Sequence, residues 1–596
     1  MTLALISSAC EPEPPPAPAP APPVAFRDTT DDARLQYRSE SFDAAAGDVD
    51  GDGSLELYLP NHGAEALLLT TSAVGPWTNR RPKSGLDPRG DQHGTALGDY
   101  DGDGDLDLYV SLGAGRGTAS KANRLYRNDG GGTFTDVAVA AGVEDPDGRS
   151  RAVAWLDANR DGRLDLLLGN YATPARLFHG RDDGTFEDAT ATLGLSVPAP
   201  LVAWTDYDRD LFPDLLIRSR DGLKLLHNEN GDFVDRTRAS GLGAVGDMVG
   251  AMSFADANGD GLLDLYLGYG TQYVEGVVEA DGEIRFAFFA GDGSKGFDFT
   301  TETDAISYDL FHNGHAVEAG DVHSQEPPSA EGFSVWRDAS PERRWHLRWA
   351  GAGDHHLSGV IRAAHDPELI ELGTWRPSGG SLWLGEADGS FERADIAGLE
   401  HDANVQMAVW EDFNNDGWVD LYLVDGGIEG EGRPNVLLLN RKGRTFSRAS
   451  DPTATGTPSP GGERGSAAQA LDYDLDGRLD LLLLNGLGVR PFNSGPYQLL
   501  RNESPKAHWV DLELIGTSSN HQGLGTWVDL DACGRRRTQY YDGPRGSFSQ
   551  SARPIHFGLG ACEAIDSVRL RWPSGIVQEV DNVSIDRQNV IREPSR

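Results

Sequence analysis

Short apolar runs recur along most of the chain, separated by turns rich in Gly, Asn and Asp. Residues 152–155 and 164–168 form one such pair, and the runs 175–180 and 185–189 follow on either side of a Gly-containing turn. Runs of this length between turn residues are typical of β-strands, and no helical periodicity separates them. The pattern therefore predicts four strands in each repeat.

An acidic loop lies between the first and second predicted strands of each repeat. In the loop that starts at Asp99, carboxylates stand at positions 1, 3, 5 and 9, and position 7 is Asp105, whose backbone carbonyl is a further oxygen. Two glycines let the backbone turn tightly. Oxygen ligands at these positions of a Gly-bent loop suit a hard cation such as Ca²⁺.

The same loop recurs seven times. Its side chains at positions 1, 3, 5 and 9 are, in chain order, Asp48, Asp50, Asp52 and Glu56; Asp99, Asp101, Asp103 and Asp107; Asp157, Asn159, Asp161 and Asp165; Asp206, Asp208, Asp210 and Asp214; Asp256, Asn258, Asp260 and Asp264; Asp412, Asn414, Asp416 and Asp420; and Asp472, Asp474, Asp476 and Asp480. A single copy would fit an acidic turn without metal equally well. Seven copies at fixed spacing favour calcium sites, up to seven in all, because two such charges about 5 Å apart repel by roughly 3 kcal/mol.

Two loops depart from the pattern. Glu56 replaces Asp at position 9 of loop one and is one methylene longer, and the loop from Asp206 to Asp214 contains no glycine. We expect these two loops to bind calcium weakly or to remain empty.

The spacing of the loops predicts the architecture. Most of the loops start about 50 residues apart, and a period near 50 with four strands per repeat is typical of a β-propeller blade. The repeats resemble the FG-GAP/VCBS family, the calcium-loop blades also found in the integrin α-subunit head. The resemblance covers residues 24–505 and implies an all-β fold, a seven-bladed β-propeller. The last repeat lacks a fourth strand, so we predict that residues 24–30 complete it and close the ring.

One interval between loops is about 100 residues too long. The excess, residues 276–378, is rich in aromatic and alternating stretches and predicts an inserted β-rich domain. It contains seven histidines, which make a transition-metal site an alternative. They show no helical zinc-ligand spacing and have no cysteine nearby, so we expect surface or hydrogen-bonded histidines: His312, His315, His323, His346, His355, His356 and His365.

The C-terminal residues 506–596 have a different sequence pattern from the repeats. The elements 557–560 (Phe-Gly-Leu-Gly) and 572–575 (Trp-Pro-Ser-Gly) resemble the ASPIC/UnbV domain, which implies a small C-terminal β domain without an established catalytic role. The whole arrangement is similar to bacterial proteins of the cartilage acidic protein type. Cys533 and Cys562 predict a disulfide in an exported protein, with two separate buried thiols as the alternative.

The N-terminal residues 1–23 indicate export. A short apolar run ends in small residues before Cys10, like the end of a bacterial lipoprotein signal, and a Pro/Ala-rich linker follows. The match is incomplete, since only nine residues precede Cys10 and none is basic. It predicts an extracytoplasmic protein, in the periplasm, outer membrane or cell surface, with a possible lipid anchor at Cys10.

Composition narrows the function. The 596 residues carry a formal net charge of −41, which seven Ca²⁺ would reduce to −27, and such acidity argues against nucleic-acid binding. No phosphate loop, dinucleotide fingerprint or nucleophile elbow is present, so we expect no enzyme and no catalytic residue. We therefore predict a monomeric, calcium-binding adhesion or recognition module for an extracellular protein or glycan. The alternatives are a structural scaffold of a surface complex and an extracellular polysaccharide hydrolase or lyase.

Overall fold

The computed structural model describes residues 23–62, 64–87, 89–115, 119–219, 222–245, 249–270, 276–280, 283–290, 293–301, 306–312, 315–316, 332–337, 344–351, 355–363, 368–369, 379–427, 432–456, 465–486, 494–543 and 546–595. Over these residues the fold is all-β, as the sequence predicts. Helical turns there are short: α1 (Ala138–Ala141), η1 (Arg81–Lys83), η2 (Thr190–Leu193), η3 (Leu242–Ala244) and η4 (Pro452–Thr455). In this part of the chain no helix is long and apolar enough to cross a membrane. Cys10 lies outside the described residues.

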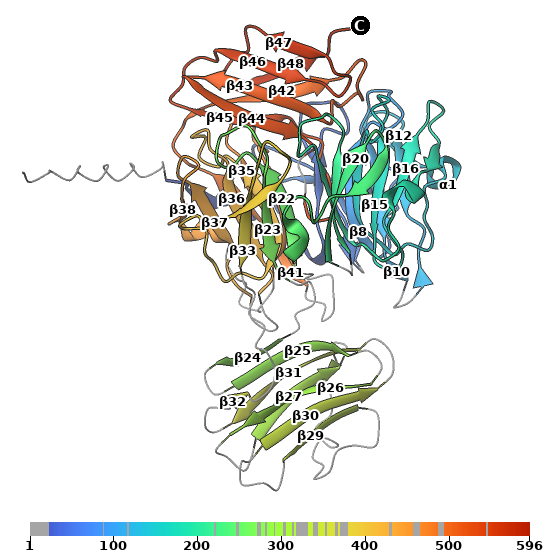
Figure 1. Cartoon of the computed structure of the whole chain (residues 1–596), viewed down its shortest axis with the longest axis vertical. Coiled ribbons are helices and arrows are strands. Elements are labelled where there is room, and N and C mark those ends of the chain that lie inside the picture. Colours follow the sequence, from blue (N-terminus) through green and yellow to red (C-terminus); the bar gives the residue numbers. More distant parts are fainter. Residues whose placement is uncertain are drawn as a thin grey trace, which may run out of the picture.

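Each acidic loop joins the first two strands of its own antiparallel sheet (Figure 1). The seven sheets are β3 (Ala45–Gly47), β4 (Glu56–Leu59), β6 (Leu67–Thr70) and β7 (Thr78–Asn79); β8 (Gln92–Gly98), β9 (Asp107–Leu112), β12 (Arg124–Asn128) and β13 (Phe134–Asp136); β14 (Ser150–Leu156), β15 (Asp165–Asn170), β16 (Arg176–Gly180) and β17 (Phe186–Asp188); β18 (Leu201–Thr205), β19 (Asp214–Ser219), β20 (Gly222–Glu229) and β21 (Asp232–Asp235); β22 (Val249–Ala255), β23 (Asp264–Tyr269), β33 (Gly380–Gly385) and β34 (Phe391–Ala394); β35 (Val405–Glu411), β36 (Asp420–Asp425), β37 (Val436–Asn440) and β38 (Phe446–Arg448); and β39 (Gly465–Leu471), β40 (Asp480–Asn485) and β41 (Gly495–Asn502) with β1 (Phe26–Asp28), β2 (Arg38–Ser41) and β5 (Asn61–His62). A small hairpin, β10 (Ala114–Gly115) and β11 (Ala119–Ser120), follows β9.

The first strands of the seven sheets contact one another in sequence. The contacts run β3, β8, β14, β18, β22, β35 and β39, and β39 contacts β3 again. Large side chains fill the space between the sheets. Trp155 of β14 is fully buried and stacks on Tyr100 and Phe186, with ring centroids 6.2 and 6.0 Å apart. Burying such rings removes a large apolar area from water and stabilises the contact between neighbouring sheets.

The N-terminal strand β1 belongs to the last sheet. It pairs antiparallel with β41, with Phe26 opposite Asn502. The Phe26 N–H also donates to Asp451 Oδ2 at 2.7 Å. The prediction that residues 24–30 complete the last repeat is therefore confirmed.

The segment between β23 and β33 forms two sheets with a common core. One contains β24 (Gly276–Ala280), β25 (Glu283–Ala290), β31 (His355–Ala363), β27 (Ile306–His312) and β28 (His315–Ala316). The other contains β29 (Gly332–Arg337), β30 (Arg344–Gly351), β26 (Gly293–Thr300) and β32 (Glu368–Leu369). Phe286 and Phe297 meet between them, with ring centroids 5.1 Å apart. In Figure 1 these sheets lie at the end of the repeats opposite the C-terminal domain.

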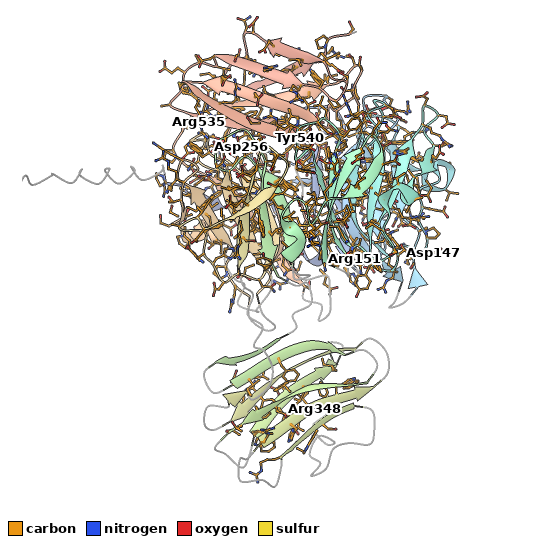
Figure 2. The ribbon with its side chains drawn as sticks, viewed as in Figure 1. Asp147, Arg151, Asp256, Arg348, Arg535 and Tyr540 are labelled. Atoms are coloured by element: carbon orange, nitrogen blue, oxygen red, sulfur yellow. A yellow bond between two sulfur atoms is a disulfide. The ribbon has the colours of Figure 1, made fainter. Side chains whose placement is uncertain are left out.

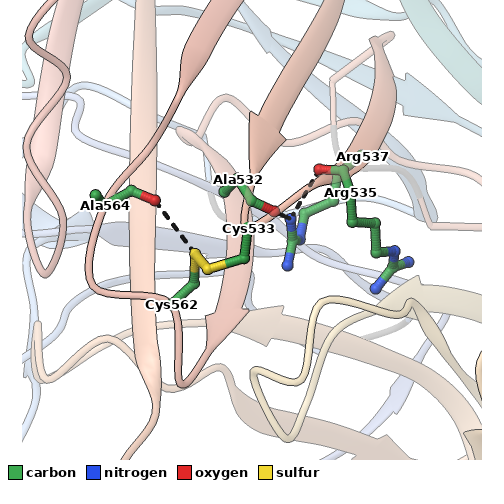
Figure 3. The surroundings of a disulfide bond; sticks show 6 residues. All are labelled: Ala532, Cys533, Arg535, Arg537, Cys562 and Ala564. Atoms are coloured by element: carbon green, nitrogen blue, oxygen red, sulfur yellow. Dashed lines mark hydrogen bonds between the residues drawn. A yellow bond between two sulfur atoms is a disulfide. The ribbon is translucent and has the colours of Figure 1, made fainter.

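The C-terminal domain also has two sheets. They are β45 (Ile555–Gly560), β42 (His508–Ile515) and β48 (Gln588–Arg592), and β44 (Arg535–Tyr541), β43 (Thr526–Ala532), β46 (Ser567–Arg571) and β47 (Val577–Val580). Cys533 and Cys562 form a disulfide with a Cα–Cα distance of 6.0 Å (Figure 3), which confirms the predicted pairing.

A loop of this domain, residues 546–552, lies among the first strands of the repeats, and we call it the central segment. Gln550 pairs with Ala96 of β8 and Ala552 with Gly47 of β3. The Phe548 carbonyl accepts the N–H of Val153 in β14 at 3.0 Å. The sequence did not predict this contact, which joins the C-terminal domain to several repeats at once.

Buried side chains fix the central segment. Asp43 is completely buried and accepts the N–H groups of Phe548 and Ser549 at 2.9 and 3.0 Å. Burial raises the pKa of Asp43 to about 6 in spite of these bonds. Gln550 is equally buried, and its side chain accepts from the Trp155 N–H at 2.6 Å and donates to the Trp155 carbonyl at 3.1 Å.

Replacing Phe26 by Ala tests the role of β1. The Phe26 ring is buried against Phe413, with centroids 6.3 Å apart, so its loss should cost about 3–5 kcal/mol and lower the melting temperature. Val139, whose side chain is 77% exposed, gives the control Val139→Ala. Differential scanning calorimetry of both variants checks this, and equal shifts would contradict it.

Replacing Gln550 by Ala tests the central segment. It leaves the Trp155 N–H and carbonyl buried without this partner, at about 1–3 kcal/mol for each group, so the melting temperature should fall clearly. Gln588→Ala, which removes an exposed hydrogen bond to Glu513, should change it little. If Gln550→Ala has the same melting temperature as this control, the central segment contributes little to the stability of the protein.

Candidate metal-binding loops

The seven loops share one backbone conformation, built around the carboxylate at position 1. In loop two, Asp99 accepts the N–H groups of Gly102, Asp103 and Gly104 at 2.8, 3.1 and 3.0 Å. The N–H groups at positions 5 and 6 donate to the position-1 carboxylate in every loop. These backbone hydrogen bonds alone hold the loop around the position-1 carboxylate, without a cation.

Positions 4 and 6 have positive φ angles, which explains the glycines there. Gly102 and Gly104 have φ of 76° and 98°. In loop four the same two positions are Arg209 and Leu211, with φ of 62° and 75°, a conformation that costs L-residues free energy. The absence of glycine therefore strains loop four but does not change its shape.

The carboxylate at position 9 begins the second strand and ties three elements together. In every loop this residue, Glu56, Asp107, Asp165, Asp214, Asp264, Asp420 or Asp480, is fully buried. Asp107 accepts the Tyr100 N–H from its own loop at 3.1 Å and the Asn128 N–H from the third strand at 2.8 Å. Six of the seven loops make this bond to the third strand.

In four of the repeats an asparagine at the end of the third strand links the loop to the preceding one. The Asn128 amide donates to the carbonyls of Leu106 and of Val49, which belongs to loop one, at 3.1 and 2.8 Å. Three others bond the preceding loop in the same way, also at 2.8 Å: Asn228, Asn440 and Asn502. Sequence reasoning assigned no role to these residues, although each closes a strand-like run before a turn.

Predicted ligands converge in the loops. In loops one, two and four, carboxylate oxygens from positions 1, 3 and 9 lie within 4.8 Å of one another. In loop six, Asp420 Oδ2 is buried with no hydrogen-bond partner among the described residues. Oxygen donors arranged in this way suit a hard cation, and an orphaned buried carboxylate oxygen is a group that a cation would satisfy.

The electrostatics of the loops point in the same direction. Burial, with nearby carboxylates as a further cause, raises the pKa of Asp107 to about 9 and that of Asp264 to about 8. Burial followed by repulsion from Asp165 and Asp161 raises the pKa of Asp157 to about 8. Ionised carboxylates are therefore costly here unless a positive charge accompanies them.

Beside several loops, a basic side chain from another part of the chain contacts the carboxylates. In loop four, His227 Nδ1 lies 3.0 Å from Asp214 Oδ1 and 3.4 Å from Asp208 Oδ2. Arg80 pairs with Asp50 in loop one, and Arg501 lies 2.6 Å from Asp474 in loop seven. These side chains neutralise part of the charge that a metal ion would otherwise neutralise.

The C-terminal domain covers the loop end of the repeats. Trp527 Nε1 donates to Asp206 Oδ2 at 2.6 Å, and His521 Nδ1 lies 2.7 Å from Asp99 Oδ2. The Arg535 guanidinium lies 3.3 Å from the centre of a ring of Trp418, the residue at position 7 of loop six. Figure 2 shows Arg535 and Tyr540 at this boundary, near Asp256 of loop five.

The histidines of the inserted segment are only partly described. His346 Nδ1 lies 2.9 Å from Asp298 Oδ1, in agreement with a hydrogen-bonded histidine. His323, His365 and the side chains of His312, His315, His355 and His356 lie outside the described residues.

Comparison with known proteins identifies both parts of the chain. A model of the FG-GAP-like repeat matches residues 48–110, 99–168, 157–217, 206–267 and 412–483. A model described as ASPIC and UnbV matches residues 516–596.

Curated relatives match a limited part of the sequence. Cartilage acidic protein 1 of mouse and of human are each 36% identical over 170 residues, which is 25% of this chain and 25% and 24% of those proteins. The chain thus spans about a quarter of the length of these relatives.

Solved structures are similar only at low scores. A lectin of Agrocybe aegerita that recognises non-reducing terminal N-acetylglucosamine has a TM-score of 0.37 and 13% identity, covering 71% of this chain and 83% of its own. The V. cholerae biofilm matrix protein Bap1 has a TM-score of 0.35 and 10% identity, covering 90% and 100%. Neither likeness supports a functional conclusion. The family matches establish the domains: the chain carries FG-GAP-like repeats and a C-terminal ASPIC and UnbV domain, and it is homologous to cartilage acidic protein 1 over the aligned part.

Proposed function

We propose that the protein is an extracytoplasmic recognition or adhesion module in which seven repeats form a calcium-stabilised, seven-bladed ring. The observation that carries the proposal is the sevenfold recurrence of one acidic loop with a fully buried carboxylate at position 9. The homology to cartilage acidic protein 1 and the FG-GAP-like repeats support an extracellular location.

The ring is supported by the contacts between sheets. The first strands meet in a cycle that returns from β39 to β3. The strand β1, from the N-terminal end of the repeat region, pairs with β41 of the last sheet. Closure of this kind leaves no first or last blade exposed, which protects the edges of the sheets. The central segment would then occupy part of the channel of the ring.

Calcium is the cation that the loops fit best, because their donors are all oxygen and extracellular loops of this kind bind at about 0.1–1 mM. Bound calcium would let the buried carboxylates ionise and would stiffen the link from one repeat to the next. In three loops a basic side chain would compete with calcium for the carboxylates: Arg80 in loop one, His227 in loop four and Arg501 in loop seven. We therefore keep the expectation of weak or empty sites for loops one and four, and extend it to loop seven.

Recognition is best placed away from the loops. The C-terminal domain contacts the loop end, whereas the inserted segment leaves the repeats after β23, whose first residue, Asp264, is a loop ligand. The connection therefore starts at the opposite end of the sheet (Figure 1). That end and the inserted sheets would bind an extracellular protein or glycan. We also keep the predictions that the protein is a monomer and that it carries a lipid anchor at Cys10.

A scaffold role is the second candidate, because the central segment interlocks the two domains. A cavity of about 140 Å³ lies between the repeats and the C-terminal domain, lined by Glu411, Tyr540, Arg553 and His556 among others. Typical small-molecule pockets have about 300–1,000 Å³. This cavity therefore gives no support to a polysaccharide hydrolase or lyase, and we propose that the protein is not an enzyme.

Replacing Asp101 by Ala tests calcium binding by loop two, since Asn would keep the oxygen that Asn159, Asn258 and Asn414 offer at this position in other loops. Asp101 is the exposed position-3 ligand, and its oxygen lies within 4.8 Å of those of Asp99 and Asp107. The variant should bind one calcium ion fewer per chain at millimolar calcium, measured by isothermal titration calorimetry. The control Asp182→Ala removes the same charge from a side chain that is 92% exposed. Equal calcium uptake by the two variants would rule out a site in loop two.

A binding panel tests recognition. The purified protein is screened against glycans and extracellular-protein extracts in millimolar calcium and in EDTA, with and without residues 276–378. The proposal predicts binding that needs calcium and is lost with the inserted segment. A rise in melting temperature with calcium but no binding would favour the scaffold role, and binding that ignores both changes would contradict the proposal.

A further inference from the structure

A cluster of two histidines and one aspartate lies away from the acidic loops. His62 belongs to β5, Asp91 immediately precedes β8, and His93 is the second residue of β8. Loop two follows the other end of β8, so the cluster stands at the end of the sheets opposite the loops. Arg151, which lies beside it, is at that end in Figure 2.

The three side chains present their ligand atoms to one another. One nitrogen of each imidazole and one carboxylate oxygen lie within 4.8 Å of each other. His93 Nε2 is 2.9 Å from Asp91 Oδ1, and His62 Nδ1 contacts the same oxygen. Two nitrogens from different strands thus converge on one carboxylate.

His93 is held in place but is not satisfied by hydrogen bonds. Its side chain is fully buried and packs against the Phe42 ring, with centroids 4.0 Å apart. Both ring nitrogens are buried without a hydrogen bond of acceptable geometry to the described residues. A buried ring nitrogen without such a bond is a donor that a metal ion would satisfy.

The backbone approaches the cluster closely at Gly113. A Cβ there would lie 2.3 Å from His93 Nε2 and 2.4 Å from Asp91 Oδ2, so only glycine fits beside these two ligand atoms. His62 and Asp91 are 20% and 12% exposed, so solvent reaches one side of the cluster.

We propose that His62, Asp91 and His93 bind a transition-metal ion of the zinc class. Two imidazoles and one carboxylate suit Zn²⁺, whereas Ca²⁺ prefers oxygen donors, so this site differs in metal from the loops. Three protein ligands leave a fourth position open on the solvent side.

Arg151 influences which ligand would occupy the fourth position. Its guanidinium lies within 2.8 Å of the same Gly113 Cβ position and faces the rings of Phe42 and Tyr171. Asp91 supplies a single negative charge against the metal ion and Arg151 together. An anionic oxygen, such as a carboxylate, would balance them, which makes this the preferred fourth ligand.

The test is zinc titration of the full-length protein saturated with calcium, which occupies the loops that bind it. Zinc taken up by the weak loops one, four and seven should be the same in the wild type and in the variants, so the comparison concerns the difference in uptake. The wild type should bind one zinc ion, and His93→Ala should bind it at least about tenfold more weakly, since even outer-shell changes cost 10–100-fold. The control His346→Ala removes a histidine of the inserted segment that also bonds a single aspartate, Asp298, and should keep the zinc ion.

Two further variants guard against misfolding. Asp91→Asn keeps the size of the side chain, and Gly113→Ala keeps all three ligands but places a Cβ against His93 and Asp91. Both should lose the visible absorption of bound Co²⁺ used in place of zinc, with melting temperatures recorded for each variant. The proposal is overturned if the calcium-loaded wild type binds no more zinc than His93→Ala, or if Asp91→Asn keeps the Co²⁺ spectrum.

Discussion

A buried carboxylate at the ninth position of each acidic loop is the interaction on which the repeats depend. Asp107 shows how: it holds the loop through Tyr100 and the third strand through Asn128, whose amide holds the preceding loop. Burial makes the ionised form costly, so the same group that organises the repeat creates a demand for positive charge. The residue that organises each repeat is therefore also the one whose charge the proposed calcium ion would balance.

The C-terminal domain makes use of the same loops. Trp527 donates to Asp206, and Gln550 reaches the first strands through the central segment. A change in one loop is thus transmitted both to the preceding repeat and to the C-terminal domain. Because this domain covers the loop end, we propose recognition at the opposite end, where the inserted sheets and the His62–Asp91–His93 cluster lie.

The sequence predicted the features that follow from the repeat pattern and missed those that do not. The loops, the disulfide and the pairing of β1 follow from repeated spacing or from a missing element, so they could be recognised before the structure. The central segment carries no repeated pattern, and its Gln550 resembles any polar loop residue. His62 and His93 meet only because β5 and β8 come together, which no spacing along the chain reveals. Loop four keeps its shape without glycine because Asp206 still anchors the backbone.

Hydrogen–deuterium exchange in calcium and in EDTA tests most directly whether a cation completes these loops. The amides that donate to the ninth-position carboxylate, such as those of Tyr100 and Asn128, should exchange more slowly when calcium is bound. Protection should extend to the preceding loop, while exposed turns such as 181–185 stay unchanged. Identical exchange in the two conditions, throughout all seven loops, would contradict the account.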